Sequence, residues 1–131
     1  MLTGGCLCGK VRYASEAAPF HETICHCESC RRAVGAASVA WFSVERAALR
    51  WTGEPALFAS SPGVQRGFCA TCGTSLSFAS DEFADEIDLT TASLDDPAIA
   101  APRDHTRAAS RLPWVAIADG LPAYPEKRPG R

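Results

Sequence analysis

The sequence predicts a mostly β protein, and the prediction comes from frequent turns and from the short runs between them. Turn-forming residues recur at close intervals: Gly4-Gly5, Gly9, Gly35, Gly53-Glu54-Pro55, Ser61-Pro62-Gly63, Gly73 and Asp96-Pro97. The runs between these turns are apolar or alternate polar and apolar side chains, which is typical of β-strands. Helical periodicity is scarce. No fixed-period repeat or linker divides the 131 residues, so we expect one domain over residues 1–131.

Seven runs are predicted to be strands. Residues 10–14 (KVRYA) alternate as a half-buried strand does, whereas residues 37–43 (ASVAWFS) are more uniformly apolar and predict a more buried strand. Residues 74–78 (TSLSF) alternate again. The other four predicted strands cover residues 49–52, 56–59, 64–68 and 86–90.

Only two short helical turns are expected, at residues 28–34 and 81–84. From Asp95 onward the chain is rich in Pro and Ala, which predicts a loop with one strand near residues 114–117. The tail from about residue 126 (EKRPGR) is expected to be flexible.

Charge and hydropathy argue against two classes of partner. The net charge is −2, and nucleic-acid binding usually needs a clear basic excess, so no nucleic-acid partner is expected. No apolar run reaches about 18 residues, so no membrane span is expected. The seven cysteines are an odd number, and no secretory signal precedes them, which predicts a cytoplasmic protein with reduced thiols. The sequence predicts no particular oligomeric state.

The cysteines form two pairs and one triple. Cys6-x-Cys8 and Cys69-x-x-Cys72 each offer two sulfurs from one turn, and Gly73 after the second pair tolerates positive φ. A structural zinc site takes four thiolates or imidazoles in a tetrahedron. The two pairs are therefore predicted to form one closed structural zinc site.

Cys25, Cys27 and Cys30 remain together in the stretch ICHCESCRR. Three protein ligands with an open fourth position are typical of a catalytic zinc site. Three thiolates on Zn²⁺ carry a net charge of −1, and Arg31 or Arg32 could offset that charge or bind an acidic substrate. Either arginine could instead be a solvated surface residue.

Two alternatives for the triple stay open. His26 or His21 could complete it as a second structural zinc, although a histidine between two ligands usually points away from the metal. The thiols could also form a transient disulfide in a redox protein. His105 is expected to be a surface or hydrogen-bonded residue.

The remaining aromatic and acidic residues are interpreted structurally. The aromatic residues Trp41, Phe42, Trp51 and Phe58 are expected in the core. The acidic residues Glu82, Asp85, Glu86 and Asp88 are expected on an exposed strand and turn.

In order along the chain, GGCLCGKVRY, CHCESCRR and FCATCGT resemble the glutathione-dependent formaldehyde-activating enzyme (GFA) family, whose domain is shared with the centromere protein V group. The later stretch SRLPWVAIADGLPAYP resembles the family's C-terminal segment, so the similarity covers about residues 3 to 125. The resemblance implies a β-tent type domain of short antiparallel strands with two zinc ions. It places the structural zinc on the two cysteine pairs and the catalytic zinc on the triple.

The resemblance also implies a zinc-dependent carbon–sulfur lyase that acts on a thiol–aldehyde adduct such as S-hydroxymethylglutathione. The expected catalytic residues are Cys25, Cys27, Cys30 and Arg31, and the expected partner is a small thiol or its adduct, with glutathione as the family's example. The alternative is a zinc-stabilised binding module without enzymatic activity. An under-coordinated metal has no use in such a module, so the triple favours the enzyme.

Overall fold

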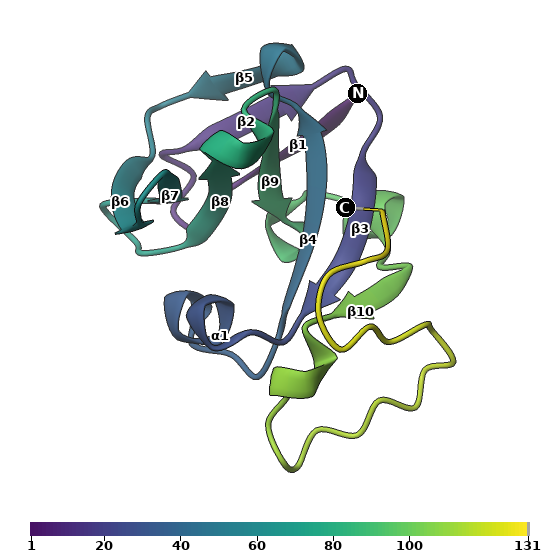
Figure 1. The fold of residues 1–131 in the computed structure, drawn as a ribbon. Helices are drawn as coiled ribbons and strands as arrows, with labels where there is room; N and C mark the ends of the chain where they lie inside the picture. The colour runs from purple at the N-terminus through teal and green to yellow at the C-terminus, as the bar shows by residue number, and fades with distance from the viewer. Residues whose placement is uncertain (131) are drawn as a thin grey trace.

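The computed structural model describes residues 1–130 and has two β-sheets with one α-helix (Figure 1). The smaller sheet has three strands in the order β1-β2-β5, with β1 at Leu2–Gly5, β2 at Arg12–Ser15 and β5 at Leu49–Thr52. The larger sheet has seven strands in the order β10-β3-β4-β9-β8-β7-β6. Its strands are β3 Phe20–Cys25, β4 Val39–Glu45, β6 Ala56–Ser61, β7 Val64–Phe68, β8 Ser75–Ser80, β9 Glu86–Thr90 and β10 Asp104–Thr106. The predicted mostly β fold is confirmed.

Strand pairing is antiparallel between all neighbours except β3 and β10, which pair in parallel. This parallel pair sets Thr106 opposite Cys25, at the end of β3 where the cysteine triple begins. The pairing therefore brings residues that lie about 80 positions later in the chain to the cysteine triple. Thr106 belongs to a segment that the sequence pattern predicts as loop, so the sequence did not indicate this neighbour.

The helix α1 (Glu28–Val34) lies where the sequence predicts it. Cys27 has an extended backbone and its sulfur accepts a hydrogen bond from the Cys30 N–H at 3.4 Å, as an N-cap side chain does. Gly35 ends the helix with φ 73°, and its N–H bonds to the Arg31 carbonyl at 2.7 Å. The two caps hold the helix so that Cys30 is its one buried residue.

Five short 3₁₀ turns complete the described elements: Arg46–Ala48, Asp81–Phe83, Thr91–Ser93, Pro97–Ala100 and Ala108–Ser110. The strand predicted near residues 114–117 is wrong, because these residues form a turn and irregular chain. Residues 114–117 are apolar, but no neighbouring strand in the described part of the chain pairs with them. None of the described helices has the length and apolar character needed to cross a membrane.

The main core lies between the two sheets. One buried cluster contains Leu2 and Tyr13 from the smaller sheet together with Phe42, Leu76 and Leu89 from the larger one. Phe42, Leu76 and Leu89 are fully buried, and each such side chain contributes about 1.5–3 kcal/mol to stability by leaving water. Cys6 and Cys69 belong to the same cluster, so the core and two of the paired cysteines are continuous.

The prediction that four aromatic residues lie in the core is confirmed only in part. Phe42 is in the core and Trp51 packs against it. Phe58 is 61% exposed on the edge strand β6, where no further strand covers it. Trp41 is buried but belongs to a second small cluster with Cys25, Cys30 and Val39.

The C-terminal segment runs back beside β10 and β3, drawn in yellow in Figure 1. The Tyr124 N–H donates to the His105 carbonyl at 2.9 Å, and Arg128 donates to the Glu22 carbonyl in β3 at 3.4 Å. Arg131, the last residue of the tail that the sequence predicts to be flexible, lies outside the described residues.

Candidate metal centres

Cys6, Cys8, Cys69 and Cys72 form one group, called here the four-thiol cluster, with all sulfurs within 4.8 Å of one another. The Cys6 and Cys8 sulfurs are 3.6 Å apart, and the Cys8 and Cys69 sulfurs are 3.7 Å apart. Tetrahedral Zn²⁺ with Zn–S bonds of about 2.3 Å separates its sulfurs by about 3.8 Å. These four residues therefore fit a zinc ion.

Backbone N–H groups aim at the sulfurs of the four-thiol cluster. Val11 N–H points to Cys6 Sγ at 3.3 Å, and Cys72 N–H points to Cys69 Sγ at 3.5 Å. The hydroxyl and backbone N–H of Thr74 lower the pKa of Cys72 to about 5, because both stabilise the thiolate. Donors of this kind offset the negative charge that four thiolates bring to a divalent ion.

Cys25, Cys27 and Cys30 form the second group, called here the three-thiol cluster, again with all sulfurs within 4.8 Å of one another. Cys25 ends β3, Cys27 is the N-cap of α1, and Cys30 lies in the helix. Contacts with the Cys25 and Cys30 thiols lower the pKa of Cys27, whereas contact with Cys27 raises the pKa of Cys25. The chemistry of three thiols fits zinc with an open position.

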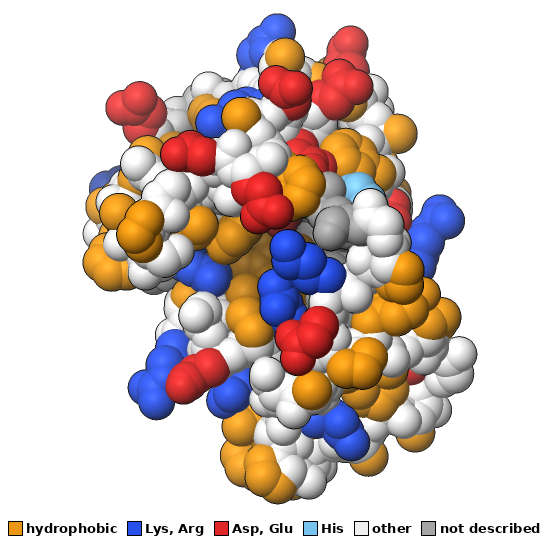
Figure 2. Space-filling view, viewed as in Figure 1, with side chains coloured by type: hydrophobic (Ala, Val, Ile, Leu, Met, Phe, Trp, Pro, Cys, Tyr) orange, Lys and Arg blue, Asp and Glu red, His pale blue; other side chains and the backbone are white. Residues whose placement is uncertain are grey.

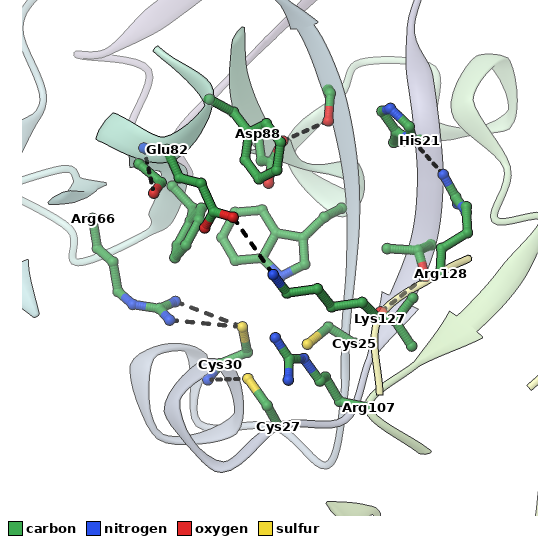
Figure 3. A pocket seen from close by; sticks show the side chains of 17 residues that line it. His21, Cys25, Cys27, Cys30, Arg66, Glu82, Asp88, Arg107, Lys127 and Arg128 are labelled. Atoms are coloured by element: carbon green, nitrogen blue, oxygen red, sulfur yellow. Dashed lines mark hydrogen bonds and ion pairs between the residues drawn. The ribbon is translucent and has the colours of Figure 1, made fainter. Parts of the chain in front are cut away.

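The three-thiol cluster lines a cavity of about 260 Å³, called here the cavity (Figure 3). Its walls include the aromatic residues Trp41, Phe78 and Phe83. Four cationic side chains also line it: Arg66, Arg107, Lys127 and Arg128. Figure 2 shows this face hollowed, with apolar side chains in orange at the floor and Lys and Arg side chains in blue beside it. The sulfurs of the three-thiol cluster are therefore accessible from a basic, partly apolar hollow.

The cationic residues differ in their partners. Lys127 pairs with Glu82 at 3.6 Å, Arg107 with Glu126 at 3.1 Å, and Arg128 with Asp104 at 2.7 Å. Arg66 instead directs both terminal nitrogens at Cys30 Sγ, each at 3.7 Å. Among the four cations that line the cavity in residues 1–130, Arg66 is the one with a hydrogen bond to a sulfur of the three-thiol cluster.

Arg31 and Arg32 do not line the cavity. Arg31 Nε donates to the His26 carbonyl at 3.2 Å, which holds the loop before α1. Arg32 is exposed and lies 3.8 Å from Glu28 one helical turn away. The sequence suggested these arginines because they follow Cys30 directly, but a helix turns its successive side chains in different directions.

His26 turns away from the sulfurs, as expected for a histidine between two ligands. Its Nε2 lies 2.8 Å from His105 Nδ1, and His105 Nε2 lies 2.7 Å from Asp119 Oδ2. The Asp119 carboxylate accepts from His105 Nε2–H. Burial lowers the pKa of His26, which favours the neutral form of the His26 ring. The chain Asp119–His105–His26 thus fastens the C-terminal segment to the three-thiol cluster.

His21 and Arg107 are the two described non-glycine residues with positive φ, at 51° and 54°, and both line the cavity. Such conformations cost about 1–3 kcal/mol and concentrate at functional sites. His21 contacts Arg128 through Nδ1. The sequence does not reveal either conformation, because glycine is the residue that usually indicates positive φ and neither residue is a glycine.

Two of the acidic residues expected on the surface also belong to this site. Glu82 and Asp88 line the cavity, and Ser43 Oγ donates to Asp88 Oδ1 at 2.5 Å. Asp85 is exposed, as expected. The cavity therefore carries both carboxylates and cations. The sequence pattern could not reveal either group, because its members come together from distant segments of the chain.

The sequence model of the family described as glutathione-dependent formaldehyde-activating enzyme matches residues 1–110. The chain belongs to this GFA family. The match covers all seven cysteines, the whole of both clusters and all ten strands. The cavity residues Lys127 and Arg128 lie beyond the matched range.

Two similar proteins were found, one by sequence and one by fold. A Schizosaccharomyces pombe protein named an uncharacterized lyase is 30% identical over 76 residues, which cover 58% of this chain and 56% of that protein. The alignment thus spans little more than half of the relative's length. A crystal structure of a Rhodobacter sphaeroides protein superposes with a TM-score of 0.58 over 93% of this chain and 98% of that one. It is 22% identical, so it supports the fold alone.

Proposed function

We propose that this GFA-family chain is a zinc-dependent carbon–sulfur lyase that acts on a thiol–aldehyde adduct such as S-hydroxymethylglutathione. The observation that carries the proposal is the three-thiol cluster on the wall of a cavity lined by cations. Family membership and the lyase-named relative point to the same class of reaction. The proposed structural zinc belongs to the four-thiol cluster.

Cys25, Cys27 and Cys30 would hold the catalytic zinc. When bound, the ion supplies positive charge that stabilises a substrate thiolate or the oxygen of a hydroxymethyl group. The reaction breaks the carbon–sulfur bond of the adduct. The hydroxyl loses its proton as the aldehyde carbonyl forms, and the departing thiolate takes up a proton.

The cavity residues would bind and orient the rest of the adduct. Glutathione carries two carboxylates and one ammonium group, and the cavity offers arginines and a lysine for the former and Glu82 and Asp88 for the latter. Trp41 and Phe78 provide an apolar wall beside the sulfurs, packed edge to face at 6.2 Å between ring centroids. This wall restricts water around the reacting bond.

The Lys127–Glu82 ion pair joins the C-terminal segment to the turn after β8 at the cavity (Figure 3). Both side chains are about half exposed, so the pair contributes about 0–1 kcal/mol and opens at little cost. A charged substrate can exchange partners with it. This arrangement supports binding of a substrate that carries both signs of charge.

The test is exchange spectroscopy on metal-loaded protein with formaldehyde and a thiol at equilibrium. We expect faster exchange between free glutathione and its hydroxymethyl adduct, and loss of that acceleration in Cys27→Ser. Arg50→Gln, an exposed change on β5, is the matched control and should exchange as the wild type does. Cysteine and 2-mercaptoethanol report on other thiols. No acceleration with any of the three thiols would favour the zinc-stabilised binding module.

A further inference from the structure

We propose that Arg66 is a positioning residue of the three-thiol cluster, and that its guanidinium both holds the Cys30 sulfur in place and balances the charge of the metal-loaded cluster. Both terminal nitrogens of Arg66 lie 3.7 Å from Cys30 Sγ. The contact joins strand β7 to helix α1 across 36 positions of the sequence. No family match or sequence motif assigns this role to the residue.

Two further contacts fix the orientation of the guanidinium. Arg66 Nε donates to Ser60 Oγ at 3.3 Å, and its central carbon lies 5.0 Å from the centre of the Phe78 ring. Strand register explains the contact with Phe78, because Phe78 of β8 and Phe58 of β6 lie opposite Arg66 on either side. A planar cation stacked on an aromatic ring keeps its edge in one direction. Here that edge faces the Cys30 sulfur.

The four-thiol cluster lies close behind this arrangement. Strand β7 ends at Phe68 and continues directly into Cys69, three positions after Arg66. The start of β8 is attached to the helix, because Ser75 Oγ donates to the Ala33 carbonyl at 3.0 Å. The closed cluster therefore anchors both segments that reach toward α1. Arg66 is presented from a rigid frame, which a positioning role requires.

Charge gives the contact its chemical consequence. Three thiolates and one Zn²⁺ carry a net charge of −1, and one guanidinium in contact makes the assembly neutral. N–H donors at a ligand sulfur also reduce its negative charge, which leaves the metal a stronger acceptor for a fourth ligand. The other three cations of the cavity are paired with carboxylates and have no recorded sulfur contact within residues 1–130. Arg66 therefore supplies the local counter-charge that the sequence pattern suggested for Arg31.

This inference rests on the proposed function only in requiring that the three-thiol cluster holds a metal. It can therefore be tested without any substrate. The protein is loaded with Co²⁺ at both clusters, and the cobalt–thiolate absorption is followed while a chelator competes for the metal. The variants are Arg66→Gln, Arg66→Lys and Arg107→Gln.

We expect Arg66→Gln to weaken metal binding at the three-thiol cluster by about 10–100-fold and to shift its absorption, as loss of a partner to a metal ligand does. Arg66→Lys keeps the charge but loses the planar pair of donors, so its affinity should fall between wild type and Arg66→Gln. Arg107→Gln removes a charge from the same cavity without touching a sulfur. The metal affinity of Arg107→Gln should stay within about 3-fold of wild type if direct contact with a sulfur matters more than the overall positive charge of the cavity.

Wild-type affinity and absorption in Arg66→Gln would overturn the proposal. Equal weakening by Arg66→Gln and Arg107→Gln would also overturn it, because the general charge of the cavity would then explain the effect. The four-thiol cluster is the internal reference, since a folded variant should retain its cobalt signal. If Arg66→Gln fails that check, Arg66→Lys decides: wild-type affinity and absorption in a folded Arg66→Lys protein would contradict the role of the planar donors.

Discussion

The four-thiol cluster and the three-thiol cluster use the same ligand but gather it from different distances along the chain. The four-thiol cluster joins two turns, and its Cys8 and Cys69 are 61 positions apart. The three-thiol cluster takes its sulfurs from residues 25–30 alone. A metal that joins distant segments restrains the whole fold, whereas a metal held by one short segment restrains little beyond it.

Their surroundings differ in the same sense. Cys6 and Cys69 are part of the main core, and their sulfurs receive backbone N–H groups. The sulfurs of the three-thiol cluster line the cavity, where Cys27 Sγ accepts from the Cys30 N–H and Cys30 Sγ contacts the side chain of Arg66. Backbone donors come with the fold, but a side-chain donor can be exchanged by mutation. The comparison teaches that the same ligand can be placed in a packed core or on the wall of an open cavity, which is the difference that the proposed structural and catalytic roles require.

The largest expected effect separates the two clusters by stability. Cys69→Ser removes a fully buried ligand from the four-thiol cluster, and the loss of metal there should remove most of the about 5–15 kcal/mol that stabilises a domain. Cys27→Ser should leave the fold intact and lower the melting temperature by less than about 5 °C. Circular dichroism melts with metal analysis measure both. Equal destabilisation by the two substitutions would remove the distinction between the clusters.

A second prediction concerns pH on the side of the four-thiol cluster. Burial raises the pKa of Tyr13 to about 12 from an ordinary value of 10. The neutral phenol is therefore favoured by folding, so its contribution is complete below pH 10 and is lost as the pH rises toward about 12. We expect a loss of about 1–2 kcal/mol over that interval, measured by urea unfolding.

Tyr13→Phe is the control for this alkaline loss. It removes the hydroxyl that lies 2.7 Å from Ser93 Oγ, so it lowers stability at neutral pH by about 1 kcal/mol but should flatten the dependence on pH between 10 and 12. An unchanged alkaline slope in this variant would assign the titration to another group. We expect this alkaline loss of stability to arise in the core beside Cys6 and to leave the cavity unaffected.

The smallest expected effect uses one glycine from each region. Gly73 follows the four-thiol cluster with φ 82°, and Gly35 ends helix α1 with φ 73°. A Cβ at either position meets no atom within 4 Å, so alanine adds only backbone strain of about 1 kcal/mol. Gly73→Ala and Gly35→Ala should therefore destabilise the fold about equally. Chelator competition should show weaker metal binding at the four-thiol cluster in the former and at the three-thiol cluster in the latter.

The sequence predicted what short-range chemistry determines. The grouping of cysteines follows from spacings of two to five residues and from the glycine after Cys72, and the structure brings together the same two groups. Helix α1 was predictable for the same reason, since Cys27 and Gly35 cap it locally. The metal content and the roles of these cysteines stay predictions.

The cavity was not predictable, because its residues meet only through long-range pairing. Arg66 lies in an alternating strand pattern that gives no reason to favour one residue over its neighbours. Strand β3 was missed because its segment, FHETIC, is half polar without regular alternation, and its pairing with β4 is irregular after Phe20. Strand β10 has only three residues, too few for a pattern, and pairs with β3 in parallel. Arg107 reaches the cavity from the end of that strand.

The distance between the two halves of the four-thiol cluster also has a consequence for biosynthesis. Ribosomes add about 5–20 residues per second, so Cys69 is synthesised about 3–12 s after Cys8. The three-thiol cluster is complete as soon as its own short segment emerges. It can therefore bind a metal on the nascent chain, before either sheet exists, and its first occupant is set by the metals available at that moment. The four-thiol cluster, by contrast, can take a four-coordinate metal only after Cys72 has been synthesised, so a metal that binds the growing chain would reach the three-thiol cluster first.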